Sequence, residues 1–265
     1  MEAKSEAQGE LMHRSISLLY HDIVQPGAFS TSGFGGADAD LYKLEAPAFI
    51  AHLNAIDASG VAAERCLFTF DDGGASAVRA AELLEERGRR GFFFVTTDYI
   101  GQPGFLRPEQ IRSIARRGHV IGSHTCSHPA RMSSLPRAAM LREWSVSRRV
   151  LSDIAGEPVT AASVPGGYYS RTVAETAAES GFTELFTSEP VSRVNRVNEI
   201  PVFGRYSVQH HSSVKTVAAI ASGALLPRLW QYAYWNAKKL VKRMGGGYWL
   251  EFRKYYLELR HGGPK

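Results

Sequence analysis

Cysteine is scarce in this sequence. Its 265 residues include only Cys66 and Cys126, too few for the disulfide framework of a small secreted domain. Two isolated thiols suit a reducing cytoplasm. The chain is long enough to bury a full hydrophobic core, and 44% of its residues are hydrophobic. We therefore expect a core, rather than covalent cross-links, to hold the fold together.

Long hydrophobic runs are also missing. The longest apolar runs fall far short of the about 20 residues that a membrane-spanning helix needs. The first fifteen residues contain no apolar segment of the kind found in secretory signals. We therefore expect no transmembrane helix, no secretory signal and a cytoplasmic location.

Most of the chain lacks an excess of basic charge. The formal net charge is +5, but residues 226–265 alone hold nine Lys or Arg and two Asp or Glu. The rest of the chain holds 22 of the 31 basic and 24 of the 26 acidic residues. A nucleic-acid-binding domain needs a basic face, so this near-neutral body argues against that class of function.

Short β-rich runs alternate with helical patterns along the sequence. The predicted strands are residues 16–20, 66–70, 92–97, 119–123, 160–164, 183–187 and 199–208. The predicted helices are residues 75–87, 108–117, 135–155 after a Ser134 cap, and 171–180 after a Ser170 cap. This alternation predicts parallel strands joined by right-handed crossovers. Seven strands favour a barrel-like α/β domain, whose site lies where the strands end.

Polar residues follow three of these predicted strands. Asp71 and Asp72 follow the second strand, and His124 and His128 follow the fourth. The stretch "SVPGGYYS", residues 163–170, ends the fifth. One barrel mouth would gather all three. A further segment, residues 25–40, reads as a long Gly- and Ser-rich loop, and loops of that length are often functional.

Two histidines and two aspartates suit a divalent metal site. Histidines four residues apart face the same side of one helical turn. Two neutral imidazoles and one carboxylate make a three-ligand Zn²⁺ site with a position left for water. The ion would lower the pKa of water to about 7, and the second aspartate would remain free as a base.

Each of these signals also has an ordinary structural interpretation. Asp-Asp-Gly is usually a turn, a histidine pair at this spacing is more often a surface or core pair, and Pro-Gly-Gly is usually a loop. Cys126 lies between the histidines and is an alternative soft ligand, although on a helical turn it would face away from them. The three signals together, each at a strand end, favour the metal site.

"TFDDG" at residues 69–73 and "SHTCSH" at residues 123–128 resemble the first two motifs of the polysaccharide deacetylases of carbohydrate esterase family 4, the NodB-homology group. The resemblance covers residues 16–208 and implies an α/β fold, a distorted (β/α)7-type barrel. It also implies hydrolysis of an acetamido group on an amino sugar with a divalent metal ion, usually Zn²⁺. Carried over by position, Asp71 is the general base, and the metal ligands are Asp72, His124 and His128.

The third motif of that family, R-x-P-Y-G, is matched only in part. Pro165 and Gly167 agree with it and, with Tyr168, are predicted to contact the substrate. Gly166 stands where the family has an aromatic residue, and its backbone N–H could still bind the oxyanion. Losing such a donor typically costs about 10²–10³ in rate.

The arginine of the third motif, which orients the base in the family, is replaced here by Ser163. Arg131 and Arg205 are the candidates to supply a guanidinium from elsewhere in the sequence. Both are also predicted to lie on the substrate side of the site.

The remaining motifs are weaker. The fourth, of D-x-x-D-W type, is not found. The fifth ends in a histidine that protonates the departing amine, and His210 and His211 in "GRYSVQHHSS" stand in about its place, with surface loop residues as the alternative. His21 is the other candidate, because Tyr20-His21 resembles a pair found in deacetylases of exopolysaccharide. These departures resemble a cytoplasmic subgroup found beside glycosyltransferases in exopolysaccharide assembly.

The sequence divides into an N-terminal extension (1–14), a deacetylase barrel (15–225) and a basic, aromatic tail (226–265), which holds three of the four tryptophans. An apolar stripe could be formed by Leu229, Trp230, Ala233, Leu240 and Val241, beside the basic residues Lys238, Lys239, Lys242 and Arg243. Two interpretations stay open: a helix packed on the barrel, or an interfacial helix at anionic lipid.

These patterns predict a metal-dependent de-N-acetylase for an N-acetylated sugar of a bacterial polysaccharide or its lipid-linked precursor. The expected partner is an N-acetylated glycan, with peripheral contact to the inner face of the membrane through the tail and no nucleic acid. The alternatives are an amidase or deformylase with the same fold, acting on a small or lipid-linked substrate, and a catalytically inactive carbohydrate-binding relative.

Overall fold

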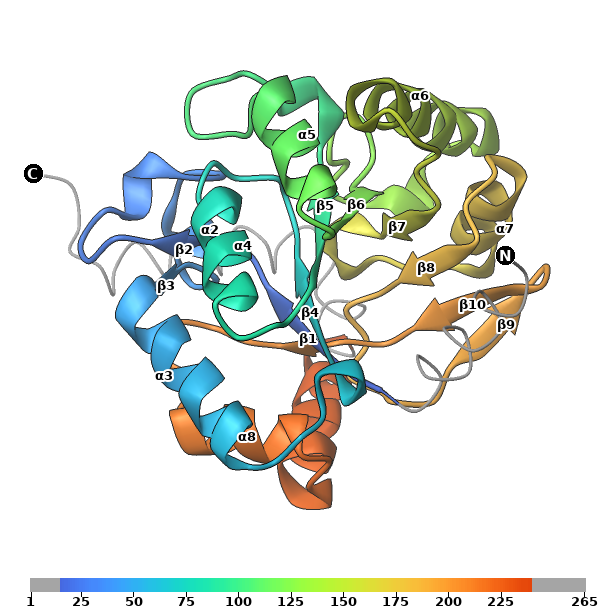
Figure 1. The fold of residues 1–265 in the computed structure, drawn as a ribbon. Coiled ribbons are helices and arrows are strands. Elements are labelled where there is room, and N and C mark those ends of the chain that lie inside the picture. Colours follow the sequence, from blue (N-terminus) through green and yellow to red (C-terminus); the bar gives the residue numbers. More distant parts are fainter. Residues whose placement is uncertain (1–14, 240–265) are drawn as a thin grey trace, which may run out of the picture.

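The computed structural model describes residues 15–239, and its centre is a nine-stranded sheet that curls around the core (Figure 1). Neighbouring strands are parallel except for the β9–β10 pair. In spatial order the strands are β11 (Tyr206–Ser207), β1 (Ile16–Tyr20), β4 (Cys66–Phe70), β5 (Gly91–Val95), β6 (Val120–Ser123), β7 (Ala161–Ser163), β8 (Glu184–Phe186), β10 (Ile200–Phe203) and β9 (Asn195–Val197). The predicted α/β class and distorted barrel are confirmed.

Helices cover the outside of the curled sheet (Figure 1). Helices α4 (Ala77–Glu85), α5 (Pro108–Arg116), α6 (Arg137–Ala155) and α7 (Arg171–Glu179) follow one another around it, while α3 (Ala46–Ala58) packs beside α8 (Val214–Ala221). A short helix, α2 (Ala37–Asp40), and a small parallel pair, β2 (Ile23–Val24) with β3 (Leu44–Glu45), lie in the segment between β1 and α3. Because β4, β6 and β7 run parallel in one sheet, the polar residues that follow these strands lie at one rim of the sheet.

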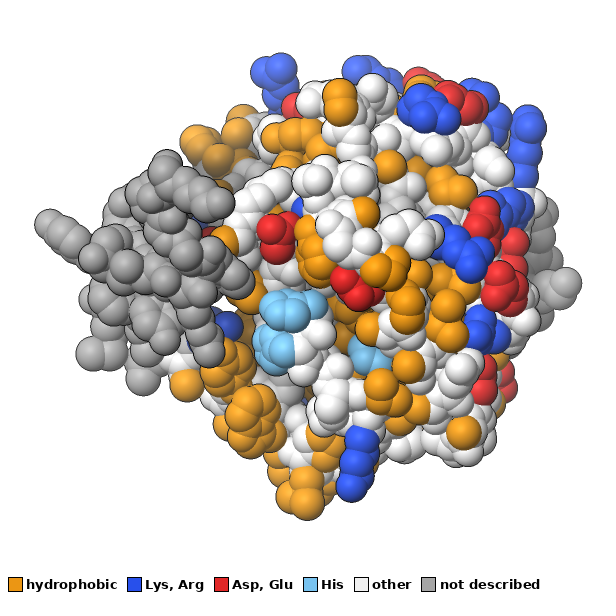
Figure 2. Space-filling view, turned by 90° about the vertical axis from the view of Figure 1, so that its left-hand side faces the viewer, with side chains coloured by type: hydrophobic (Ala, Val, Ile, Leu, Met, Phe, Trp, Pro, Cys, Tyr) orange, Lys and Arg blue, Asp and Glu red, His pale blue; other side chains and the backbone are white. Residues whose placement is uncertain are grey.

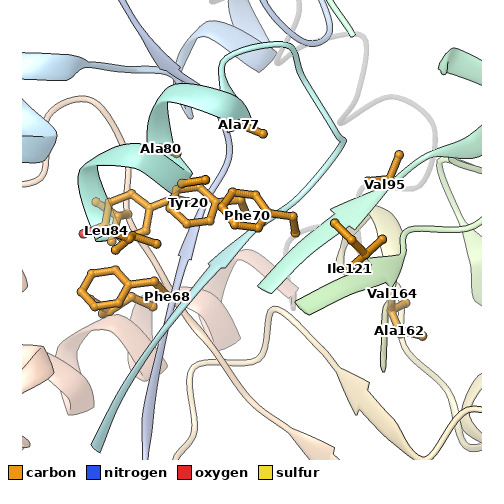
Figure 3. Close-up of a cluster of buried hydrophobic side chains, with 14 of the residues drawn as sticks. Tyr20, Phe68, Phe70, Ala77, Ala80, Leu84, Val95, Ile121, Ala162 and Val164 are labelled. Carbon is orange, nitrogen blue, oxygen red and sulfur yellow. The ribbon is translucent and has the colours of Figure 1, made fainter. Parts of the chain in front are cut away.

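Phenylalanine-rich strands build the core. Strands β4 and β5 read CLFTF and GFFFV and are almost fully buried, as expected for parallel strands covered on both faces. The rings of Phe70 and Phe93 stack 4.8 Å apart. Figure 3 shows Tyr20 and Phe70 beneath α4, which presents small residues, Ala77 and Ala80, toward them. This packing fixes the end of β4, from which the two aspartates emerge.

The sheet is nearly closed into a barrel by two residues. Strand β10 pairs with β8, whereas β11 pairs with β1 at the other end of the sheet, and only Gly204 and Arg205 connect them. Gly204 has no room for a side chain, because the carbonyl oxygens of Glu189 and Val191 lie against it. The strand predicted over residues 199–208 is therefore wrong as a single element, and its break lies at Arg205.

Other predictions differ locally. Ser170 caps α7, accepting a hydrogen bond from the Val173 N–H at 3.3 Å, as predicted. The Ser134 cap is wrong, because Ser134 lies in a short 3-10 turn and Pro136 precedes α6. The sequence prediction omits α3 and α8. Within residues 15–239, no helix combines the length and apolar content needed to cross a membrane.

Candidate metal and catalytic site

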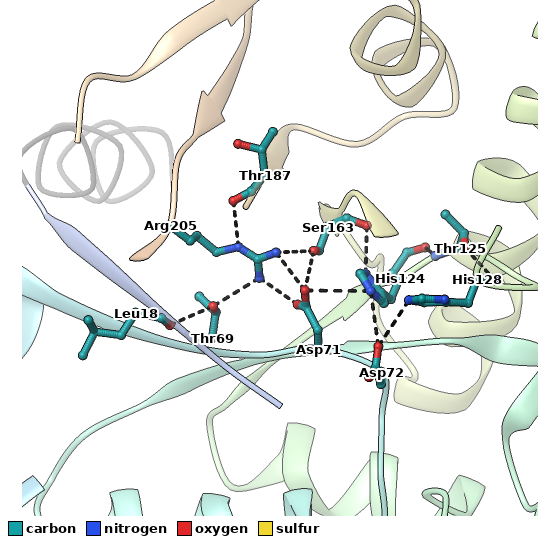
Figure 4. Close-up of polar contacts among 11 residues, drawn as sticks. Leu18, Thr69, Asp71, Asp72, His124, Thr125, His128, Ser163, Thr187 and Arg205 are labelled. Atoms are coloured by element: carbon teal, nitrogen blue, oxygen red, sulfur yellow. Dashed lines mark hydrogen bonds and ion pairs between the residues drawn. The ribbon is translucent and has the colours of Figure 1, made fainter. Parts of the chain in front are cut away.

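Two adjacent aspartates leave the end of β4 in different directions. Figure 4 shows the Asp71 carboxylate toward Arg205 and Ser163, and the Asp72 carboxylate toward the histidines. Asp72 makes this turn with φ of 76°, a left-handed conformation that costs a non-glycine residue on the order of 1 kcal/mol. The following Gly73 also has positive φ, and a Cβ there would press on Val95. The sharp turn keeps the two like charges pointed apart.

The histidines lie on a loop after β6, not on a helix. Residues 124–128 contain no helical turn, and Thr125 and His128 have φ of 69° and 55°. The predicted helical turn is therefore wrong, although the two imidazole rings still converge, with centroids 5.0 Å apart. The left-handed residues, rather than helical periodicity, bring them together. Cys126 points elsewhere, with its Sγ 3.4 Å from the Glu143 carbonyl.

Asp72, His124 and His128 form a group that could hold a metal ion. Asp72 Oδ1 lies 3.5 Å from His124 Nε2 and 3.4 Å from His128 Nε2, and one ligand atom from each residue lies within 4.8 Å of the others. Tetrahedral ligands at about 2.0–2.2 Å from one ion would be separated by about 3.4 Å. Asp72 Oδ1 is buried and has no hydrogen-bond partner among the described residues. The donor set and its spacing therefore fit a divalent cation.

The orientation of His124 also suits a ligand. Its Nδ1–H donates to the Ser163 carbonyl oxygen at 3.0 Å, which leaves Nε2 as the free lone pair facing Asp72. Burial lowers the pKa of His124 to about 3, although the Asp71 charge opposes the shift. Burial lowers the pKa of His128 as well. Both rings are neutral at pH 7, the form that binds metal ions.

Arg205 holds Asp71 from the seam between β10 and β11. Its Nη1 and Nη2 donate to the two carboxylate oxygens of Asp71 at 2.7 and 2.8 Å, and the guanidinium is fully buried. The remaining N–H groups donate to the Thr187 carbonyl, Thr69 Oγ1 and Ser163 Oγ. All five guanidinium donors are thus used. Of the two arginines predicted to replace the third-motif arginine, Arg205 is the one that contacts Asp71.

Ser163 connects the base to the rest of the site. Its hydroxyl accepts from Arg205 Nη2 at 2.7 Å and donates to Asp71 Oδ2 at 3.2 Å. A serine at this position is short enough to leave room for the Arg205 guanidinium. The substitution in the third motif is therefore matched by an arginine that arrives from a different strand.

The two aspartates have opposite electrostatic environments. Burial raises the pKa of Asp72 well above its usual range, and the charges of Asp71 and then Asp22 raise it further. Burial is also the largest influence on Asp71 and acts in the same direction, but the charges of Arg205 and His124 and the hydrogen bonds from Arg205 together outweigh it and hold the pKa of Asp71 below its usual range. Asp71 is therefore ionised beside its arginine, while the charges of Arg205 and Lys43 offset the effect of burial on Asp72 only in part, and a bound cation would offset it further.

Of the predicted proton donors, His21 rather than His210 feels the charge of the Asp71 carboxylate. The Asp71 charge acts on it, although burial lowers the pKa of His21 to about 4. Its ring packs 4.7 Å from that of Tyr42, and its Nδ1 has no hydrogen-bond partner within residues 15–239. The contacts found for His210 are with the Leu41 carbonyl and the ring of His211, which are outside the cluster.

The third-motif residues follow β7 directly. Pro165–Gly167 form a short 3-10 turn, in which Gly166 is exposed with φ of 65°. A Cβ on Gly166 would approach the Ala130 carbonyl oxygen at 2.8 Å. The Arg131 guanidinium lies over the Tyr168 ring at 5.4 Å. Arg131 therefore borders this turn rather than Asp71.

Glu143 of α6 anchors the histidine loop, and the sequence analysis omits it. Its Oε2 accepts from the backbone N–H groups of Cys126 and Ser127 at 2.8 and 2.9 Å, and its Oε1 accepts from Ser127 Oγ at 2.7 Å. These bonds hold the loop between the two histidines. No pattern in the sequence connects residue 143 with residue 127.

Phe34, on the predicted functional loop, is a second omission. Its ring lies 4.9 Å from that of His128 and 4.8 Å from that of Tyr99. It is partly exposed, so it forms an aromatic wall beside the histidines. The loop is fixed there because Ser32 Oγ donates to the buried Asp22 at 2.5 Å and Gly33 N–H donates to the Gly104 carbonyl at 2.8 Å.

Comparisons with known proteins find polysaccharide deacetylases. The family model described as polysaccharide deacetylase matches residues 59–185. The Bacillus subtilis protein YxkH is 29% identical over 48% of this chain and 46% of its own length. The chitooligosaccharide deacetylase of Sinorhizobium fredii is 30% identical over 52% of this chain and 63% of its own. The chain thus spans about half of YxkH and less than two thirds of the second relative.

Solved structures share the fold. IcaB from Ammonifex degensii superimposes with a TM-score of 0.63, covering 78% of this chain and 97% of its own, at 24% identity. Identity at this level carries the fold alone, and the fold is the curled barrel described above.

Proposed function

Because this chain contains a polysaccharide deacetylase domain of the NodB type, we propose that it removes the acetyl group from an N-acetylated sugar by hydrolysis. The observation that supports this most directly is the separation of two adjacent aspartates into different roles. Asp71 is held by two hydrogen bonds from Arg205 and lies 3.8 Å from His124 Nε2, while Asp72 lies closer to both His124 and His128. A hydrolase needs a base and an electrophilic centre next to each other.

Asp72, His124 and His128 are the proposed ligands of a divalent cation, with Zn²⁺ the ion that this donor set suits best. When bound, such an ion polarises a carbonyl group and lowers the pKa of water to about 7. Asp71 would take the proton of the attacking water, oriented by the two hydrogen bonds from Arg205. The backbone N–H of Gly166 is the proposed donor to the oxyanion.

Cleavage of the amide C–N bond releases acetate and a free amine, and the amine needs a proton. His21 is the proposed donor, because it lies within the field of Asp71 and has an unpartnered nitrogen. With a pKa lowered to about 4, its ring is neutral at rest, and the proton that it passes to the amine would be the one that Asp71 takes from the attacking water. Phe34 is proposed to pack against the sugar ring, with Pro165, Gly167 and Tyr168 on the other side.

The proposed substrate class is an N-acetylhexosamine in a bacterial polysaccharide or its lipid-linked precursor. The support is the chitooligosaccharide named for one relative. Gly166 and Tyr168 are at least partly exposed, and an exposed site suits a glycan better than a small enclosed substrate. We propose that the enzyme works in the cytoplasm.

Acetate release from a panel of N-acetylated glycans tests the activity. The wild-type protein should release acetate and leave a free amine, and Asp71→Asn should lose nearly all of this rate. Formate or a ring-opened acid as the product would instead identify a deformylase or amidase. No product from any N-acetylated sugar, with the metal site loaded, would contradict the proposal and favour the inactive binding relative.

A pair of histidine variants tests the proton donor. His21→Gln should lower kcat by about 10²–10⁴, the usual worth of general acid help. His210→Gln, outside the cluster, is the matched control and should keep the wild-type rate. The reverse pattern would assign the role to His210.

A further inference from the structure

The helix at residues 225–239 is apolar on its outer side. Leu225, Leu226, Leu229 and Trp230 are 63%, 80%, 51% and 69% exposed. Figure 2 shows hydrophobic side chains at the lower end of the molecule, where this helix and α8 lie in Figure 1. Monomeric soluble proteins rarely expose such a contiguous apolar patch without a partner.

Polar contacts fix the inner side of this helix. Arg228 Nε donates to the Tyr206 hydroxyl at 2.9 Å, and its Nη1 donates to the Gly223 carbonyl at 3.1 Å. Gln231 Nε2 donates to the Ser207 carbonyl at 2.9 Å. The usual amphipathic arrangement, apolar inside and polar outside, is thus reversed. Rotation of the helix to bury its apolar side against the barrel would break these hydrogen bonds.

The helix also has the charge and the rings of a membrane-interface segment. Arg228 is the only charged residue between 225 and 237, and it faces inward, so the outer surface is uncharged until Lys238 and Lys239. Trp230 and Tyr234 stack at 5.4 Å on the exposed side. Tryptophan and tyrosine favour the boundary between headgroups and acyl chains, and lysines favour anionic headgroups.

We propose that this outer surface, Leu225, Leu226, Leu229, Trp230 and Tyr234, binds an anionic membrane surface, with Lys238 and Lys239 contacting the headgroups. Residues 226–265 hold nine basic and two acidic residues, which complements anionic lipid. The same charge opposes a second copy of this chain as the occupant, because pairing two such tails would bring like charges together. This inference is independent of the deacetylase activity.

Vesicle co-sedimentation with the full-length chain tests it. The wild type should pellet with phosphatidylcholine vesicles that contain phosphatidylglycerol, and far less with phosphatidylcholine alone. Lys238→Gln with Lys239→Gln should weaken binding about 25-fold, since each basic residue contributes about 1 kcal/mol, or fivefold, near an anionic surface. The matched control, Arg142→Gln with Arg149→Gln, removes two exposed charges from α6 and should bind as the wild type does.

A second double variant, Leu226→Ser with Trp230→Ser, tests the apolar contribution and should also lose binding, with an unchanged circular dichroism spectrum and melting temperature showing that it folds. Asp71→Asn should bind like the wild type, which separates this result from any failure of the deacetylase proposal. Equal pelleting of all variants, or a wild type that fails to pellet and instead elutes as a dimer that the Leu226 and Trp230 changes disperse, would overturn the membrane proposal.

Discussion

The metal and catalytic cluster and the helix at residues 225–239 depart from the usual distribution of side chains in opposite ways. At the barrel rim the charges of Asp71, Asp72 and Arg205 are buried. On the helix, Leu226 and Trp230 face outward. Each arrangement costs free energy unless a partner compensates it. In our proposals a bound cation would compensate the first region, and an anionic lipid surface would compensate the second.

The largest expected effect on stability and activity comes from removing Arg205 from its buried ion pair with Asp71. Arg205→Met should destabilise the fold by about 3–5 kcal/mol, because it leaves the Asp71 carboxylate buried without a partner. Activity should fall by at least about 10², since the base loses its orientation. Urea unfolding and steady-state kinetics measure the two effects.

The control for this change is the double variant Arg205→Met with Asp71→Asn. It removes the stranded charge and should recover much of the stability but none of the activity. If Arg205→Met alone were as stable as the wild type, Arg205 would not be compensating the buried charge of Asp71.

The next effect concerns the tight turn after the aspartates. A Cβ on Gly74 would overlap the Asp22 carboxylate and Ser32 Oγ, so Gly74→Ala should cost about 1–3 kcal/mol, as overpacking usually does. Gly35→Ala, where a Cβ meets nothing within 4 Å, is the matched control and should leave the melting temperature unchanged. Equal melting temperatures for both variants would contradict the packing around Asp22.

The mildest change loosens the histidine loop. Glu143→Ala removes the acceptor of two backbone N–H groups and should weaken Zn²⁺ binding about 10–100-fold, a typical effect of residues that orient metal ligands. Glu143→Gln keeps one acceptor oxygen and should recover part of the affinity. Asp153→Asn, near the end of the same helix and exposed, is the control and should match the wild type in a chelator competition assay. An unaltered Zn²⁺ affinity in Glu143→Ala would show that Glu143 does not orient the histidine loop for metal binding.

Local sequence patterns predict the elements well where apolar periodicity is strong. The strands at 16–20 and 66–70 agree with β1 and β4 residue for residue, because continuous buried runs such as CLFTF fit few other structures. Helix α3 is absent from the sequence prediction, although Phe49, Leu53 and Ile56 have helical spacing.

The site is harder to predict than the strands. Sequence motifs identify Asp71, Asp72, His124 and His128, but not how they meet. His124 and His128 converge through left-handed residues rather than the helical turn that their spacing suggests. Arg205 and Glu143 reach the site from distant elements, and such long-range contacts leave no local pattern. The sequence could offer Arg205 only as one of two candidates, and the fold brings it to Asp71 by interrupting a strand.

Metal content tests the central claim most directly. After dialysis against a weak chelator and reloading with Zn²⁺, the wild-type chain should retain one equivalent by elemental analysis, and His124→Ala should retain essentially none while keeping its melting temperature in the metal-free form. A His124→Ala protein that still held a full equivalent would contradict the assignment of Asp72, His124 and His128 as the cation site.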